Sequence, residues 1–178
     1  MRSRLQLAHT ALLDAEALSA ARSLLFEVFA PEMTQEDWEH ALGGLHALIW
    51  DGEELIGHAA VIQRQLIYEG RALRTGYVEG VAVRAEHRRQ GHGTRLMAAL
   101  DPVIRSAYEL GALGSTDVAA AMYEAAGWIC WQGPTAGLTP EGTIPTPEED
   151  GSIYVLQPTP PLEATRALTC DYRAGELW

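Results

Sequence analysis

The first forty residues contain two kinds of hydrophobic pattern. Residues 5–8 alternate weakly between apolar and polar side chains, which predicts a short strand. From residue 17 to residue 28 apolar side chains return at helical spacing, and Asp14 stands where a helix N-cap is expected. Residues 34–37 have the sequence Thr-Gln-Glu-Asp, a cap followed by first-turn acids. We therefore expect a second, short helix that Gly43-Gly44 ends.

The middle of the chain has the pattern of a β-meander. Residues 47–50 and 55–67 are rich in strand-forming side chains and flank the tight-turn pair Asp51-Gly52, which predicts a β-hairpin. A third run at 71–83 contains many β-formers and suits a central strand. Gly80 within that run predicts a bulge or a close approach of another group to the backbone.

The second half alternates between strands, turns and helices. A glycine-rich turn at 88–94 leads into a helix whose apolar face covers 96–107 and which Pro102 either kinks or divides. Residues 133–151 are rich in Pro, Gly and Thr and are predicted to form one long loop. The other expected elements are a strand at 110–113, a helix capped by Asp117 and running to Ala126, and a strand at 153–156.

Composition and charge narrow the class of molecule. The 178 residues have the size of one domain, so we expect a single domain over 1–178. Hydrophobic side chains at 47% and charged ones at 21% are typical of a globular protein. Thirteen basic against 24 acidic residues give a net charge of −11. That charge would repel nucleic acid and anionic membranes and favours a cationic substrate, although it also serves solubility.

Metal binding and export are not indicated. Cys130 and Cys170 lie far apart, and neither they nor the six histidines have metal-ligand spacing, so we expect no disulfide framework and no metal. The basic start at residues 1–5 is not followed by a long apolar stretch, and no window of 18 apolar residues occurs. We therefore expect a cytoplasmic protein with neither signal peptide nor transmembrane helix.

The glycine-rich turn is the first chemical signal. It consists of Arg88, Arg89, Gln90, Gly91, His92, Gly93 and Thr94. Backbone N–H groups at the start of a helix bind anions, glycines let a diphosphate come close, and arginines add charge-assisted hydrogen bonds. The turn lacks the Lys-Ser/Thr of a P-loop and the spacing of a dinucleotide fold. The alternative is an ordinary strand-to-helix turn.

The pattern Arg88-x-x-Gly91-x-Gly93 after a strand resembles the acetyl-coenzyme A (acetyl-CoA) signature of the GNAT superfamily of N-acetyltransferases. A wider set of segments resembles the aminoglycoside 2′-N-acetyltransferases within that superfamily, over nearly the whole chain. These segments are 37–40, 43–50, 58–64, 76–84, 133–135 and the ending Cys-Asp-Tyr-Arg-Ala-Gly-Glu-Leu-Trp at 170–178.

The resemblance implies an α+β fold with a seven-strand mixed sheet. The strands near 75–83 and 110–113 would splay apart in this GNAT fold and admit the pantetheine arm of acetyl-CoA. Backbone atoms of Val81, Ala82 and Val83 would pair with that arm, and the turn at 88–94 would hold the pyrophosphate. The resemblance also implies a homodimer.

Acetyl transfer to an amine needs a base and a proton donor. By resemblance Glu79 is the base, acting directly or through water, because a bound ammonium must lose a proton before it attacks a thioester. Tyr123 matches the superfamily tyrosine that protonates the leaving thiolate. The C-terminal Trp178 completes the expected catalytic set. The alternatives are a solvent-facing strand carboxylate for Glu79 and a buried ring on a helix face for Tyr123.

A polycationic substrate requires a rim of carboxylates. Acids cluster in loops and near the C-terminus, among them Asp171, and any one of them has the alternative of a solvated surface side chain. By resemblance, aspartates of the family stand at the positions of three of the substrate-binding glutamates. The full expected substrate set is Glu32, Glu79, Glu149, Asp150, Glu176 and Trp178.

The resemblance implies transfer of acetyl from acetyl-CoA to the 2′-amino group of aminoglycosides, which confers resistance. One alternative is acetylation of another amine, such as a cell-wall amino sugar or a polyamine, because an acidic pocket suits any polycation. The other is a non-catalytic module that binds acetyl-CoA or the drug. The presence of both Glu79 and Tyr123 favours catalysis.

Overall fold

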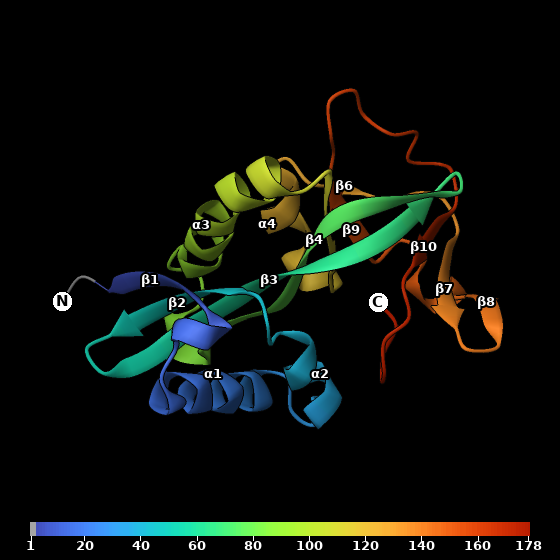
Figure 1. The fold of residues 1–178 in the computed structure, drawn as a ribbon. Helices are drawn as coiled ribbons and strands as arrows, with labels where there is room; N and C mark the ends of the chain where they lie inside the picture. The colour runs from blue at the N-terminus through green and yellow to red at the C-terminus, as the bar shows by residue number, and fades with distance from the viewer. Residues whose placement is uncertain (1–2) are drawn as a thin grey trace. The chain divides into compact units, whose positions relative to one another are not determined.

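The computed structural model describes residues 3–178, apart from the side chain of Asp117, and the basic start at Met1 and Arg2 lies outside it (Figure 1). The chain divides into two compact units, each described by itself. Unit 1 comprises the residues up to Ile62 and Val78–Pro102, and unit 2 comprises Gln63–Tyr77 and Val103–Trp178. Whether these form the single domain expected from the chain length stays a prediction.

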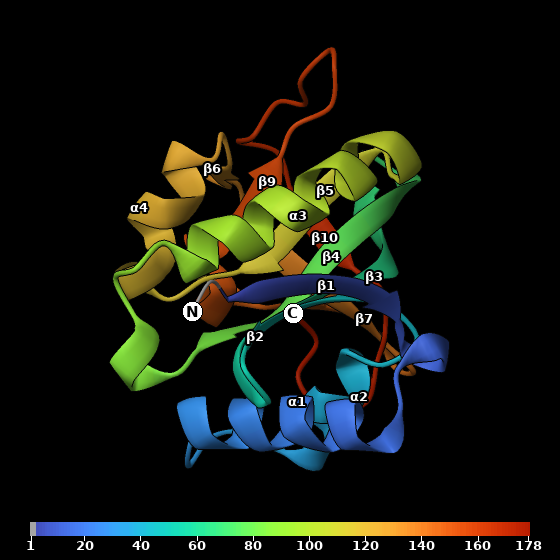
Figure 2. The same ribbon diagram turned by 90° about the vertical axis from the view of Figure 1, so that its left-hand side faces the viewer.

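Unit 1 combines antiparallel strands with helices. Its elements are β1 (Arg4–His9), η1 (Thr10–Leu12), α1 (Ala15–Val28), α2 (Gln35–His40), β2 (Leu45–Asp51), β3 (Glu54–Tyr68) up to Ile62, β4 (Arg71–Val83) from Val78, η2 (Ala85–His87) and α3 (His92–Ala107) up to Pro102. Strand β2 pairs antiparallel with β1 and with β3. Helices α1 and α2 lie on one side of β1 and β2, and α3 lies on the other (Figures 1 and 2).

Local capping explains where the first helices begin. The Asp14 carboxylate accepts a hydrogen bond from Ala17 N at 2.8 Å at the start of α1. Thr34 and Asp37 form a reciprocal capping box that opens α2. Both caps confirm the sequence prediction. The buried face of α1 packs with Leu48 of β2 in the core of unit 1.

Pro102 lies inside α3, which is one continuous helix. Of the two alternatives predicted for Pro102, division of the helix is therefore wrong, whereas a kink stays a prediction. A proline removes one hydrogen bond of a helix, and the buried side chains Leu96, Leu100 and Ile104 on either side supply apolar packing that offsets this loss.

Unit 2 holds the remaining strands. Its elements are β3 from Gln63, β4 up to Tyr77, the end of α3, β5 (Leu110–Gly114), α4 (Asp117–Ala125), β6 (Ile129–Cys130), β7 (Thr135–Thr139), β8 (Gly142–Pro145), η3 (Pro147–Glu149), β9 (Ile153–Leu156) and β10 (Leu168–Cys170). The strand order is β6-β9-β5-β4-β3-β10-β7-β8. The β4–β5 and β7–β10 pairs are parallel, whereas β5–β9, β6–β9, β3–β10 and β7–β8 are antiparallel. The mixed sheet with helices confirms the α+β fold class.

The segment 133–151 corrects one sequence prediction. It is not a long loop, because it contains the β7–β8 hairpin and η3. Strand β7 is completed by β10, which follows about thirty residues later, so no local pattern could reveal the pairing. The described residues form ten strands rather than the seven that the resemblance implies. Helix α4 also differs from expectation, since Thr116 stands at its N-cap and Asp117 is its first residue.

Pairing between β4 and β5 is short. Three residue pairs connect the two strands, from Thr75 opposite Leu110 to Tyr77 opposite Ala112. The last two residues of β5 pair only with β9 among the described strands. The parallel pairing therefore ends at Tyr77, in agreement with the splayed sheet of the expected fold.

Candidate active site

The glycine-rich turn of unit 1 is shaped by its own residues. Arg89 and Gly91 adopt positive φ angles of 59° and 81°. The Arg88 side chain donates from Nε to Val83 O at 3.0 Å, and Gln90 donates from Nε2 to Glu86 O at 3.1 Å. The turn is thereby tied to the end of β4 and to η2.

The turn presents backbone donors where α3 begins. Arg95 N donates to Gly91 O at 3.0 Å, so the N–H groups of His92, Gly93 and Thr94 precede the first helical hydrogen bond. A Cβ atom added to Gly91 would meet no protein atom within 4 Å. An anion can therefore approach this backbone closely, and the donors and exposed arginines fit the pyrophosphate of acetyl-CoA.

Strand β4 carries the candidate base and the expected pantetheine-binding residues. Glu79, Val81 and Val83 are half-buried, while Ala82 is buried. Gly80 has φ +56°, and an added Cβ would lie 3.0 Å from Leu25 Cδ1. The predicted close approach at Gly80 is thus confirmed.

Tyr123 of α4 belongs to an aromatic cluster in unit 2. Its side chain is 4% exposed, and its ring lies 6.3 Å from that of Trp128 and 6.1 Å from that of Tyr154. Burial raises the pKa of Tyr123 to about 12. The phenol is therefore protonated at neutral pH, as a proton donor must be.

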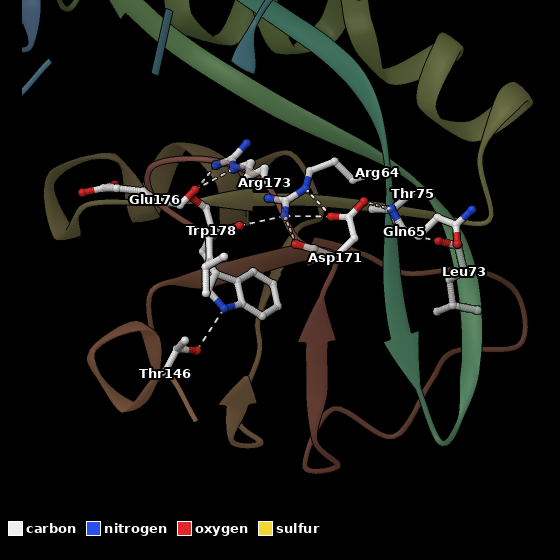
Figure 3. A network of polar contacts seen from close by, with 10 residues as sticks. Arg64, Gln65, Leu73, Thr75, Thr146, Asp171, Arg173, Glu176 and Trp178 are labelled. Atoms are coloured by element: carbon white, nitrogen blue, oxygen red, sulfur yellow. Dashed lines mark hydrogen bonds and ion pairs between the residues drawn. The ribbon is translucent and has the colours of Figure 1, made fainter. Parts of the chain in front are cut away.

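The C-terminus of unit 2 is held in place by side chains (Figure 3). Trp178 is 8% exposed, and its indole Nε1 donates to Thr146 Oγ1 at 2.9 Å. Arg173 donates from Nη2 to Trp178 O at 2.6 Å and from Nε to Glu176 O at 2.7 Å. Residues 176–178 are therefore fixed, and the main-chain oxygen of Trp178 already has a guanidinium beside it.

A buried arginine supports the same segment. Arg64 of β3 is 3% exposed and donates to Asp171 Oδ1 at 2.8 Å and to Leu177 O at 2.7 Å (Figure 3). Burial is the largest single effect on Arg64 and opposes its charge, but Asp171, Tyr77 and Cys170 together outweigh it, so the pKa of the guanidinium is raised. Asp171, expected among the acids of the substrate rim, instead forms an ion pair with Arg64.

The other candidate acids differ in how they are engaged. Glu32 is exposed just after α1 in unit 1. In unit 2, Glu149 accepts a hydrogen bond from Ser152 Oγ at 2.8 Å, and Glu176 is exposed. Asp150 Oδ1 accepts from both N and Oγ1 of Thr135, at 2.8 and 2.9 Å. A substrate ammonium would therefore bind Asp150 through its other carboxylate oxygen.

The structure groups these residues within each unit. Unit 1 carries Glu79, Val81–Val83 and the turn at 88–94 on one strand-turn-helix segment. In unit 2 a hydrogen-bonded chain connects Asp150 through Thr135 and Thr146 to Trp178. Tyr123 contacts aromatic rings instead. A cavity of about 630 Å³ in unit 2 is lined by residues of β4, β5, the end of α3 and 156–162, and by none of the candidate residues.

Sequence reasoning missed the residues that hold the site. They are His46, His58, Arg64, Thr135, Thr146 and Arg173. Apart from Arg173, whose partners are Glu176 and Trp178, they have partners at least eleven residues away in the chain. The available signal was a polar residue within an apolar strand pattern, as at His58 and Arg64. Within residues 3–178, no cluster of three or more His, Cys, Asp and Glu side chains is arranged for a metal ion. No helix in the described part of the chain could span a membrane.

Comparisons with known proteins agree with this geometry. A family profile described as acetyltransferase (GNAT) domain matches residues 10–130. The aminoglycoside 2′-N-acetyltransferase of Mycolicibacterium fortuitum is 48% identical over 177 residues, covering 97% of this chain and 91% of that protein.

Solved structures share the fold at low sequence identity. The GNAT family N-acetyltransferase YhbS of Escherichia coli, solved in complex with CoA, has a TM-score of 0.66 at 17% identity and covers 97% of this chain and 90% of its own. ElaA of Escherichia coli has a TM-score of 0.63 at 18% identity, over 88% of this chain and all of its own.

Proposed function

Because the chain belongs to the GNAT family of acetyltransferases, we propose that it transfers the acetyl group of acetyl-CoA to the 2′-amino group of aminoglycosides and so confers resistance. The observation that carries this proposal is the 48% identity, over 97% of the chain, to a protein with that name. The open, donor-rich turn before α3 supports the acetyl-CoA part, and the acidic residues support a cationic substrate.

Acetyl-CoA supplies a thioester whose carbonyl carbon is attacked by a neutral amine. The turn at 88–94 holds the pyrophosphate through backbone N–H groups and arginine side chains. Backbone groups of Val81–Val83 pair with the pantetheine arm. These contacts place the thioester without using the side chains that move protons.

Two side chains carry the proton transfers. Glu79 takes a proton from the substrate ammonium, directly or through water, which gives the amine a free electron pair. Tyr123 is protonated at neutral pH because burial raises its pKa to about 12, and it donates to the thiolate of coenzyme A as the C–S bond breaks.

The substrate is held by carboxylates. Glu32, Glu149, Asp150, Glu176 and the terminal carboxylate of Trp178 bind the remaining ammonium groups. Arg173 partly neutralises the negative charge of the terminal carboxylate, which weakens its attraction for an ammonium group. Arg173 also fixes the position of that carboxylate, so an ammonium group that binds there orders it at little cost in conformational entropy. We further propose a homodimeric, cytoplasmic enzyme, which size-exclusion chromatography and cell fractionation would test.

The decisive experiment measures release of free coenzyme A with matched amines. We expect turnover with aminoglycosides that carry a 2′-amine and none with analogues that carry a 2′-hydroxyl, because the hydroxyl offers no basic nitrogen. Turnover with polyamines or amino sugars but not with aminoglycosides would favour the alternative substrates. Binding of acetyl-CoA without turnover on any amine would favour the non-catalytic alternative.

The roles of Glu79 and Tyr123 are tested with Glu79→Gln and Tyr123→Phe. Each should lower kcat by about 10² to 10⁴ where proton transfer limits the rate. Loss of Glu79 should be partly rescued at high pH, because more of the amine is already neutral. Full turnover of Glu79→Gln at neutral pH, with chemistry rate-limiting, would exclude Glu79 as the base.

A further inference from the structure

Two buried histidines of unit 1 form a continuous chain of hydrogen bonds. His46 of β2 and His58 of β3 are both 0% exposed, and His46 Nδ1 lies 3.0 Å from His58 Nε2. The chain continues from His58 Nδ1 to Gly80 O at 2.8 Å. At its other end His46 Nε2 lies 2.8 Å from Thr10 Oγ1. The chain thus connects η1 to β4 through the core of the unit.

The direction of these hydrogen bonds follows from the chemistry of the two ends. A carbonyl oxygen only accepts, so His58 carries its proton on Nδ1 and donates to Gly80 O. In a neutral imidazole the other nitrogen accepts, so His46 donates from Nδ1 to His58 Nε2. His46 Nε2 then accepts a hydrogen bond from the Thr10 hydroxyl at 2.8 Å, which is shorter than the alternative contact of that hydroxyl with Gly44 O at 3.2 Å. Gly43 N–H donates to Thr10 Oγ1 at 2.9 Å.

Both imidazoles are neutral in the folded protein at neutral pH. Burial lowers the pKa of His46 to about 4, with a further lowering by His9. Burial also lowers the pKa of His58 to about 4, against the opposing hydrogen bond to Gly80. All three donors therefore point toward β4, and bonds aligned in this way polarise and strengthen one another. Because Gly80 O has no proton to pass on, the chain fixes geometry and does not conduct protons.

The position at which the chain ends is exceptional within β4. Gly80 has φ +56°, a left-handed conformation that strand residues rarely adopt. A Cβ atom there would meet Leu25 at 3.0 Å and His58 Nδ1 at 3.4 Å, so α1 and His58 both crowd this backbone. Gly80 O belongs to the peptide plane whose N–H is that of Val81, and in a trans peptide the two groups point in opposite directions. A donor on Gly80 O therefore also sets the direction of Val81 N–H.

We propose that His58 is a positioning residue for acetyl transfer: by donating to Gly80 O it fixes the turn in β4 that orients Glu79 and the N–H of Val81. This inference rests on the proposed function, in which Glu79 is the base and Val81–Val83 bind pantetheine. His46 and Thr10 act one and two steps further away, by holding the His58 tautomer that donates to Gly80.

A matched pair of amides at residue 58 tests the proposal. Asn places an amide donor where His has Nδ1, and Gln places it where His has Nε2. We expect His58→Asn to retain kcat/KM for acetyl-CoA within about three-fold. His58→Gln leaves Gly80 O without its donor, so we expect a loss of about 10- to 100-fold. Both variants carry a buried amide. If His58 only stabilised the fold, both substitutions would lower Tm to a similar extent, and kcat/KM per folded molecule would stay unchanged in both.

Controls separate this outcome from general damage and from failure of the proposed function. Trp50→Phe removes the hydrogen bond from Trp50 Nε1 to Gln6 Oε1, also on strands of unit 1, and should keep wild-type kcat/KM. Calorimetry measures the binding of acetyl-CoA without any amine present. It can therefore compare the Asn and Gln variants even if aminoglycosides are not the substrate. Where His58→Gln does not fold, His58→Leu replaces it with the same expected loss. Equal kcat/KM and equal acetyl-CoA affinity for the Asn and Gln variants would overturn the proposal.

Discussion

The two units hold their candidate residues with opposite kinds of polar network. In unit 1 two neutral imidazoles, entirely buried, form a chain in which His46 donates to His58 and His58 donates to the carbonyl of Gly80 beside Glu79. In unit 2 the guanidiniums of Arg64 and Arg173 donate to carbonyls of the C-terminal segment that ends at Trp178. In both units a side chain determines the position of the backbone next to a candidate site residue.

The difference shows how each network depends on charge. A guanidinium keeps its charge at every physiological pH, and Asp171 raises the pKa of Arg64 further, so the network of unit 2 is indifferent to mild acid. The network of unit 1 requires two imidazoles to stay neutral. Mild acid should therefore destabilise the network of unit 1 before that of unit 2. Removal of a charged side chain, in contrast, should lower the free energy of unfolding most in unit 2.

The largest expected effect is on stability in mild acid. His46 and His58 titrate near pH 6.5 when unfolded and near pH 4 when folded, so the unfolded chain binds more protons between these values. The free energy of unfolding should therefore be unaffected above pH 6.5 and fall as the pH decreases toward 4. The full loss is about 3 kcal/mol for each histidine. This full loss is reached only below pH 4, and urea titrations at pH 7.5, 6 and 5 would measure the part of it that occurs above pH 5.

A double variant, His46→Gln with His58→Asn, is the control for this pH dependence. It removes both titrating groups, so the slope between pH 6.5 and pH 5 should flatten even if the variant is less stable throughout. An unchanged slope would show that other groups carry the acid sensitivity.

Removal of the buried cation of unit 2 comes next in size. Arg64→Met should lower the free energy of unfolding by about 3 to 5 kcal/mol, because the Asp171 carboxylate and Leu177 O lose a buried partner. Arg71→Met is the matched control. Arg71 pairs with Glu109 at the surface, where the expected loss is about 0 to 1 kcal/mol. Equal losses of unfolding free energy for the two variants in urea titrations would contradict the distinction between a buried and an exposed ion pair.

In unit 1, Gly91→Val should weaken acetyl-CoA binding by about 10-fold or more, which corresponds to about 1.4 kcal/mol. The new side chain would enter the open space before α3, where we propose that the pyrophosphate binds. Gly70→Val is the control, because Gly70 has a φ of +78°, close to the +81° of Gly91, and equally open surroundings. A valine therefore causes similar backbone strain at both positions. Calorimetry that found the same affinity for both variants would remove the turn from the cofactor site.

The smallest effect concerns the C-terminal segment of unit 2. Deletion of residues 176–178, or extension beyond Trp178 by a tag, should raise the aminoglycoside KM by about three- to ten-fold, because a fixed carboxylate and its neighbours are lost or displaced. Affinity for acetyl-CoA should stay at the wild-type value. The same tag placed at the N-terminus is the control, and wild-type kinetics from the truncated chain would show that the segment is dispensable.

The sequence by itself determined the features that depend on neighbours in the chain. Asp14 caps α1 from three residues away, and Thr34 and Asp37 cap α2 in the same way. The predicted tight turn joins β2 to β3, although its two residues are Gly52-Glu53 rather than Asp51-Gly52, because Asp51 still pairs with Glu54. The turn at 88–94 was recognised for the same reason, since its glycines, arginines and following helix are consecutive. Such features need no knowledge of the rest of the fold.

Only the tertiary structure decided how the site residues are held. His58 meets Gly80 across 22 positions, Trp178 meets Thr146 across 32, and Arg64 meets Asp171 across 107. A hydrophobic or polar pattern states that a residue is buried or exposed, but it does not state which distant partner satisfies a buried donor. The sequence therefore placed Glu176 and Trp178 in the expected site but could not show what holds them, whereas contacts with side chains from distant segments make the C-terminal segment a fixed part of unit 2.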